Sequence, residues 1–184
     1  MRKKIIISSL LVGCGLVMLS SCSSKPKNAI PIHDFEINRY LGTWYEIARF
    51  DFRFEKNLNN TSAQYYLGNN GYVKVINSGY NFKKEKWTKA EGIAKFRGEK
   101  NIAALKVSFF GPFYSGYNVV ALDDEYRYAL VVGKNLEYLW ILSREKTIPE
   151  EIKNHYLQIA SDIGYDISKL IWVSHDKSDN PFLD

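Results

Sequence analysis

The chain has 184 residues, of which 46% are hydrophobic and 15% aromatic, so it can form one soluble domain with a sizeable core. This composition excludes a disordered chain and a membrane protein with several spans. The net charge of +5 falls to +2 once Arg2, Lys3 and Lys4 are set aside, which excludes the strongly basic surface of a nucleic-acid-binding protein.

The first 21 residues have the pattern of a secretory signal. A basic start precedes an apolar run at 5–19, which is short for a stable bilayer span. The Leu-Ser-Ser-Cys sequence ending at Cys22 resembles a bacterial lipobox, whose cysteine is acylated and becomes the new N-terminus. Leu-Val-Gly-Cys ending at Cys14 fits the same pattern, but cleavage there would leave apolar residues 15–19 in the mature protein. We therefore expect a signal peptide at 1–21 and lipidation of Cys22; an uncleaved anchor and plain secretion with a free Cys22 thiol are the alternatives.

The Ser-Ser-Lys-Pro-Lys-Asn sequence after Cys22 is polar and predicts a flexible tether over 22–34 that reaches roughly 35–40 Å when extended. Ser23, rather than an aspartate, follows the cysteine, and by resemblance to lipoprotein sorting signals this indicates the outer membrane, on its periplasmic side. Both cysteines lie in the leader region, so the remaining chain has no disulfide and no cysteine metal site.

From residue 41 onward, apolar or alternating segments are separated by Asn-, Gly- and Asp-rich turns. The links are too short for intervening helices, so neighbouring strands are antiparallel and close into a barrel or a sandwich. The predicted strands are 43–51, 61–67, 72–78, 87–96, 102–109, 117–122, 128–133 and 137–143.

A single helix follows the strands. Residues 147–150 have the spacing of a capping box, and Gly164 provides the stop. Apolar residues recur at helical spacing between them: Ile152, Tyr156, Ile159 and Ile163. A short strand at 170–174 follows, so one domain is expected over 35–176, with a polar tail at 177–184.

Gly42 and Trp44 near the first strand, together with Arg144 at the end of the last, resemble the signature of the lipocalin family. Further stretches at 79–81, 104–114 and 138–144 resemble the bacterial outer-membrane lipoproteins of that family, whereas residues 122–126 depart from its middle signature. The resemblance implies an all-β fold, an eight-stranded antiparallel up-and-down barrel with one C-terminal α-helix packed outside. It also implies that Trp44 plugs the closed end and that Arg144 lies across its ring, as a structural and not a catalytic pair.

Strand alternation then predicts which side chains line the barrel lumen. Counting from Trp44 places Glu46, Ala48 and Phe50 inside and Arg49 outside, and counting back from Arg144 places Trp140 and Tyr138 inside. The family pattern adds Asn118 and puts Tyr114 near the mouth. The predicted ligand pocket comprises Glu46, Ala48, Phe50, Ala63, Tyr65, Val75, Asn77, Leu105, Val107, Tyr114, Asn118, Tyr138 and Trp140.

This lining is mostly apolar and aromatic, as in a pocket for one hydrophobic ligand. Glu46 and Asn118 are the exceptions. Glu46 either recognises a ligand head group or has a basic partner or water. The bulky Tyr65, Tyr138 and Trp140 also fit a barrel filled by side chains without a cavity.

Catalytic and metal-binding patterns are missing from the sequence. His33, His155 and His175 are widely separated, no Gly-x-Ser-x-Gly occurs, and the acidic pair at 123–124 lies in a predicted turn. We therefore expect no enzyme activity, no metal and no cofactor.

The family resemblance implies a lipid-anchored carrier of a fatty acid or lysophospholipid that serves membrane lipid transport, storage or maintenance. The expected partners are that lipid and the membrane holding acylated Cys22, with no nucleic acid, and the protein is a monomer or a homodimer. Two alternatives come from other classes: a filled-barrel scaffold that binds a protein partner, and a lipocalin-type enzyme acting on a bound lipophile.

Overall fold

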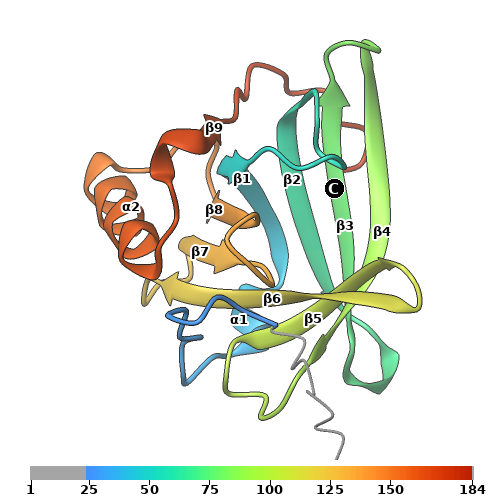
Figure 1. Ribbon diagram of the computed structural model, residues 1–184. Helices are drawn as coiled ribbons and strands as arrows, with labels where there is room; N and C mark the ends of the chain where they lie inside the picture. Colours follow the sequence, from blue (N-terminus) through green and yellow to red (C-terminus); the bar gives the residue numbers. More distant parts are fainter. Residues whose placement is uncertain (1–23, 184) are drawn as a thin grey trace, which may run out of the picture.

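The computed structural model describes residues 24–183, in which strands β1 to β8 form a closed barrel (Figure 1). The predicted signal peptide and Cys22 lie outside the described residues. The strands are β1 (Gly42–Phe50), β2 (Leu58–Leu67), β3 (Val73–Asn81), β4 (Lys86–Phe96), β5 (Ala104–Phe110), β6 (Phe113–Leu122), β7 (Tyr128–Val132), β8 (Leu139–Ser143) and β9 (Leu170–Trp172). The helices are α1 (Ile37–Tyr40) and α2 (Glu150–Ile163), with short 3₁₀ turns at Asn69–Gly71 and Ile167–Lys169.

The barrel closes through β1, which pairs antiparallel with both β2 and β8. Each of the eight barrel strands therefore has two neighbours, which removes the exposed edges of an open sheet. The first half of β1, Gly42 to Tyr45, pairs with β2. Its second half, Ala48 to Phe50, pairs instead with β9 outside the barrel. This confirms the predicted antiparallel up-and-down barrel and decides against the sandwich.

One end of the barrel is plugged by α1 and aromatic side chains. Trp44 is fully buried, its Nε1 donates to the Tyr40 carbonyl at 2.8 Å, and the two rings lie 4.7 Å apart. The guanidinium carbon of Arg144 lies 3.9 Å from the centroid of the Trp44 ring, in cation–π geometry. Arg144 also donates to the carbonyls of Arg39, Leu41 and Thr43, so one side chain joins α1 to the first strand.

The helix α2 covers the outside of the barrel over β1, β7 and β8 (Figure 1). Its buried residues are Tyr156, Ala160 and Ile163, and Gly164 ends it with a φ of 113°. The helix begins at Glu150 after Pro149, with no side-chain cap, so the predicted capping box is wrong. The Thr147 carbonyl is instead bound by the Ser143 hydroxyl at 2.8 Å. Within residues 24–183, neither helix is long and apolar enough to cross a membrane.

Both ends of the described residues lie against the barrel. On the N-terminal side, Ile32 donates its N–H to the Val119 carbonyl and accepts from the Ala103 N–H, each at 3.0 Å. The flexible tether predicted for 22–34 is therefore wrong from Ser24 onward, because this segment is hydrogen-bonded to the barrel. The C-terminal residues follow the outer face of β2 and β3, where Asn180 Nδ2 lies 2.9 Å from Ser78 Oγ.

Candidate functional site

A β-bulge in β1 decides which of its side chains line the lumen. Trp44 lies opposite Ala63, and Glu46 lies opposite Leu142, so both face inward. The register shifts between Glu46 and Ala48, and beyond it Arg49 lies opposite Trp140. A bulge inserts one extra residue and so reverses the alternation of everything after it.

Three predictions for β1 are therefore wrong. Ala48 and Phe50 face outward and pack in the cluster under α2 and β9, where the Phe50 ring lies 5.5 Å from Tyr165. Arg49, predicted to lie on the outer surface, faces inward and is only 2% exposed. Glu46 faces the inner side of the barrel as predicted, and its part in a ligand site stays a prediction.

A second bulge, between Val119 and Ala121, affects β6 in the same way. Tyr117 and Val119 belong to the interior cluster together with Leu122. Asn118 consequently faces outward, and its Nδ2 donates to the carbonyls of Val132 and Ser24 at 3.1 Å each. The prediction that Asn118 lines the pocket is wrong; it holds the N-terminal segment against the barrel instead.

The remaining predicted pocket residues divide into two groups. Tyr114 lies on the outer side, with Lys106 Nζ 5.0 Å from its ring, and Tyr138 lies at the rim, stacked 6.3 Å from Trp140. The inward-facing residues are Ala63, Tyr65, Val75, Leu105, Val107 and Trp140, which belong to the interior cluster, and Asn77, which lies opposite Ala63.

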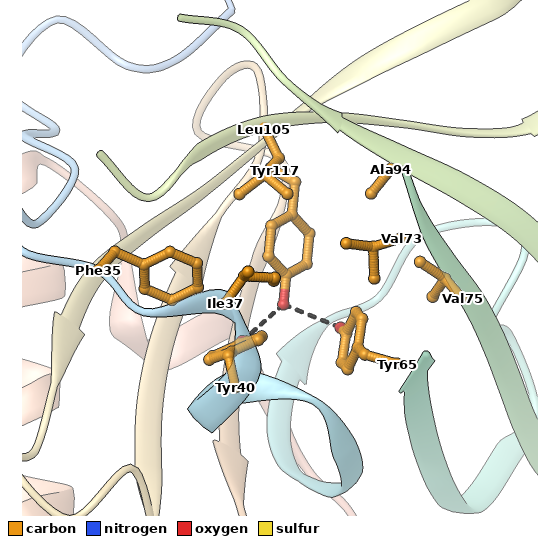
Figure 2. A pocket seen from close by; sticks show the side chains of 9 residues that line it. All are labelled: Phe35, Ile37, Tyr40, Tyr65, Val73, Val75, Ala94, Leu105 and Tyr117. Carbon is orange, nitrogen blue, oxygen red and sulfur yellow. Dashed lines mark hydrogen bonds between the residues drawn. The ribbon is translucent and has the colours of Figure 1, made fainter. Parts of the chain in front are cut away.

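The closed end of the lumen is filled by tyrosine side chains (Figure 2). The Tyr117 hydroxyl lies 2.7 Å from that of Tyr40 and 2.8 Å from that of Tyr65, and burial raises the pKa of all three phenols. The enclosed cavity around them has a volume of about 10 Å³, enough for the centre of roughly one water molecule. The plugged end therefore has no room for a ligand. Any lumenal site lies on the other side of the tyrosine layer, in the part of the barrel interior here called the upper lumen.

The upper lumen, on the side of the tyrosine layer away from α1, is mainly apolar. Ala63, Asn77, Val107 and Trp140 face inward yet keep partial exposure, which for inward-facing residues means contact with an accessible interior. The Oδ1 atom of Asn77 is buried and has no hydrogen-bond partner. An apolar wall with a small number of polar groups is typical of a small-ligand pocket.

A buried polar cluster interrupts this apolar wall. Arg49 Nη1 lies 3.4 Å from Glu46 Oε2, and Arg49 Nε lies 3.5 Å from Glu55 Oε2. Glu55 comes from the loop between β1 and β2 and also accepts from Trp140 Nε1 at 3.2 Å. The cluster therefore holds two carboxyl groups and one guanidinium group, with residue exposures of 5%, 9% and 2%.

Burial raises the pKa of both carboxyl groups. For Glu46 the Arg49 charge and the Thr61 hydroxyl oppose the rise, whereas for Glu55 the neighbouring Glu46 charge increases it, so the Glu55 pKa lies well above its ordinary value. The cluster thus binds a proton more readily than exposed carboxyl groups do, and its one cation already has two carboxyl partners. Glu46 was the only member predicted, because no sequence signal marks the bulge that brings Arg49 inside.

The three histidines of the chain are separated in the structure as well as in the sequence. His33, His155 and His175 lie on different segments, and His175 Nε2 lies 2.8 Å from the Glu46 carbonyl oxygen. In the part of the chain that the structure describes, no three His, Cys, Asp or Glu side chains gather where they could hold a metal ion.

Comparison with known proteins agrees with this geometry. The family model described as a lipocalin-like domain matches residues 35–175. The outer membrane lipoprotein Blc of Citrobacter freundii is 55% identical over 158 residues, covering 86% of this chain and 89% of the relative. Its Escherichia coli K12 counterpart is 52% identical over 163 residues, covering 89% of this chain and 92% of the relative.

A solved structure shares the fold at low sequence identity. Insecticyanin from the tobacco hornworm Manduca sexta has a TM-score of 0.67 at 23% identity, covering 83% of this chain and 86% of its own. The family model, the similar lipoproteins and the closed barrel agree: the chain belongs to the lipocalin family.

Proposed function

We propose that the protein binds one fatty acid or lysophospholipid in the barrel and carries it at the membrane. The observation that carries this proposal is the accessible apolar lumen with the Glu46–Arg49–Glu55 cluster at its wall. An acyl chain above the tyrosine layer would leave water, and burying its surface contributes roughly 25 cal/mol per Å².

The composition of the polar cluster favours one of these two ligand classes. Because one guanidinium group is shared by two carboxyl groups, the cluster offers no unpaired cation to the carboxylate of a free fatty acid. A zwitterionic lysophospholipid carries its own counter-charge and needs none from the protein. We therefore place a zwitterionic lysophospholipid ahead of a free fatty acid.

The proposed location is the periplasmic side of the outer membrane, with the protein held by acylated Cys22. The lipobox pattern and the similar proteins, which are named outer membrane lipoproteins, support this location. A carrier held at its source of lipid needs no diffusion step to meet its cargo. Catalysis is not part of the proposal, because the barrel interior offers binding groups and no assembled nucleophile and base.

A lumen-filling variant tests the proposal. Asn77→Trp places an indole inside the lumen, whereas Ile76→Trp places the same ring outside, one residue earlier on β3. We expect Asn77→Trp to weaken binding of a fluorescent acyl probe at least tenfold, about 1.4 kcal/mol. Lysophosphatidylethanolamine should displace that probe from the wild type. Ile76→Trp should bind as the wild type does.

The head-group preference has its own comparison. Lysophosphatidylethanolamine should displace the probe at lower concentration than the fatty acid of equal chain length, and Glu46→Gln should narrow that difference.

Equal binding by both tryptophan variants would contradict a lumenal site. A wild-type protein that takes up neither lipid would leave the filled-barrel scaffold in its place.

A further inference from the structure

Large apolar side chains are exposed at the tip of the β5–β6 hairpin. Phe110 is 63% exposed, Phe113 is 79% exposed and the adjoining Tyr114 is 39% exposed. Phe54, from the loop between β1 and β2, is 58% exposed and lies 5.6 Å from Phe110 by ring centroids. Contiguous exposed aromatic rings of this kind mark a protein–protein or membrane interaction site.

Basic side chains lie beside two of these rings, Lys106 at Tyr114 and Arg53 at Phe54. Residues 102–122, which include both strands of the hairpin, contain no acidic residue. Lys106 is exposed on the outer face opposite Lys95, and its Nζ lies 5.0 Å from the Tyr114 ring. Aromatic rings beside lysines match the interfacial layer of a bilayer, where rings sit at headgroup depth and lysines meet anionic lipid.

The chain end that carries Cys22 reaches the barrel on the same hairpin. The Ser24 carbonyl accepts from Asn118 Nδ2 at 3.1 Å, and its hydroxyl is bound by Arg97. Ser24 is packed so closely over Gly116 that a Cβ atom there would lie 1.9 Å from the Ser24 carbonyl oxygen.

The chain length between Ser24 and Cys22 limits how far a lipid anchor can lie from the exposed rings. Cys22 lies two residues before Ser24, at most about 7 Å of extended chain. Gly116 lies three residues after Phe113, about 10 Å along β6. A bilayer that holds the acyl chains of Cys22 is consequently within reach of the hairpin tip.

We infer that the aromatic tip formed by Phe54, Phe110, Phe113 and Tyr114 inserts into the interfacial layer of the bilayer that holds Cys22. The inference rests on the proposed acylation of Cys22. Phe54 adjoins Glu55 of the lumenal polar cluster, so insertion turns the lumen mouth toward the lipid. A lysophospholipid then passes between bilayer and barrel without crossing open water.

Site-specific fluorescence on the acylated full chain tests this orientation. An environment-sensitive NBD label is placed at Phe113→Cys, and the protein is reconstituted into vesicles of phosphatidylethanolamine and phosphatidylglycerol. The matched control is Leu67→Cys, since Leu67 is 55% exposed but ends β2 at the plugged end of the barrel. We expect a blue-shifted emission and quenching by spin-labelled lipid at residue 113 and neither effect at residue 67.

Three results would overturn the inference. In the first, neither label responds to vesicles. In the second, spin-labelled lipid quenches both labels equally. In the third, the emission of the label at residue 113 shifts to the blue without vesicles, in proportion to protein concentration. The last result identifies a second copy of the chain as the occupant of this surface.

A second variant separates this inference from the proposed function. Phe110→Glu with Phe113→Glu should slow uptake of lysolipid from vesicles and leave uptake from dilute solution unchanged. Loss of both would indicate damage to the lumen, and unchanged vesicle uptake would contradict docking by the tip. The mass of the mature N-terminus reports independently whether Cys22 is acylated.

Discussion

At the scale of single residues, Arg49 determines the charge balance of the barrel interior. Its guanidinium group lies between Glu46 and Glu55 and also donates to the carbonyls of Glu55 and Leu58, at 3.1 and 2.8 Å. One arginine thus ties the β1–β2 loop to the lumen wall. Removing it would leave two buried carboxyl groups without a cation, which is far more costly than losing an exposed pair.

The titration of Glu55 gives a testable pH dependence. Its pKa is raised above the ordinary value of 4.5 by burial and by Glu46, so the folded state binds a proton more tightly than the unfolded state. The free energy of unfolding therefore falls as pH rises from about 4.5 toward the raised pKa, and is constant above it. Glu55→Gln does not titrate and keeps an acceptor for Trp140.

Urea unfolding of the wild type and Glu55→Gln between pH 4.5 and 8 measures this effect. The stability of the variant relative to the wild type should increase with pH over that range. A difference that stays constant, or that decreases with pH, would show that the Glu55 pKa is not raised in the folded state.

Arg144 has a structural role that predicts a large loss of stability. Arg144→Ala removes the charge above the Trp44 ring and the donor to three carbonyls around α1, which should cost about 3–5 kcal/mol in thermal or urea unfolding. Arg127 is exposed and its Cζ lies 5.6 Å from the Tyr128 ring, so Arg127→Ala should change stability by less than about 0.5 kcal/mol. Equal effects of the two substitutions would contradict the role of Arg144.

At the scale of elements, the strands were predictable from alternation and turn residues, but their bulges were not. The period-2 pattern from Trp44 assigned Glu46 to the correct face and failed at Ala48 and Phe50. The bulge at Ile47 reverses the alternation there, and apolar residues on both faces of the strand hide the reversal. In β6 the family pattern failed at Asn118 for the same reason. A bulge adds one residue without altering composition, so only the paired strand reveals it.

The helix α2 was predictable as an amphipathic stripe, and its packing gives a further prediction. Ala160 is fully buried between α2 and the barrel, and Ala160→Leu should overpack this interface and cost about 1–3 kcal/mol. Ser161 is the next residue and is exposed, so Ser161→Leu should have an effect below about 0.5 kcal/mol. Thermal unfolding of both variants measures the difference, and a neutral Ala160→Leu would show that α2 is loosely packed.

At the scale of the whole molecule, the closed barrel and its plugged end followed from the family signature at Trp44 and Arg144. The packing of the N-terminal segment did not, because the polar residues 23–28 give no side-chain pattern and the apolar run after them is too short to have one. Ile32 joins the barrel through backbone hydrogen bonds, which any residue can form. The hairpin tip was likewise unpredicted, since exposed and buried phenylalanines have the same sequence signal.

Native mass spectrometry of the acylated full chain, followed by extraction and identification of the lipid, tests the carrier function most directly. The wild type should hold one lysophospholipid or fatty acid per barrel, Ile76→Trp should retain it, and Asn77→Trp should lose it. A wild-type protein that carries no lipid and takes up no added lysophospholipid would contradict the carrier function.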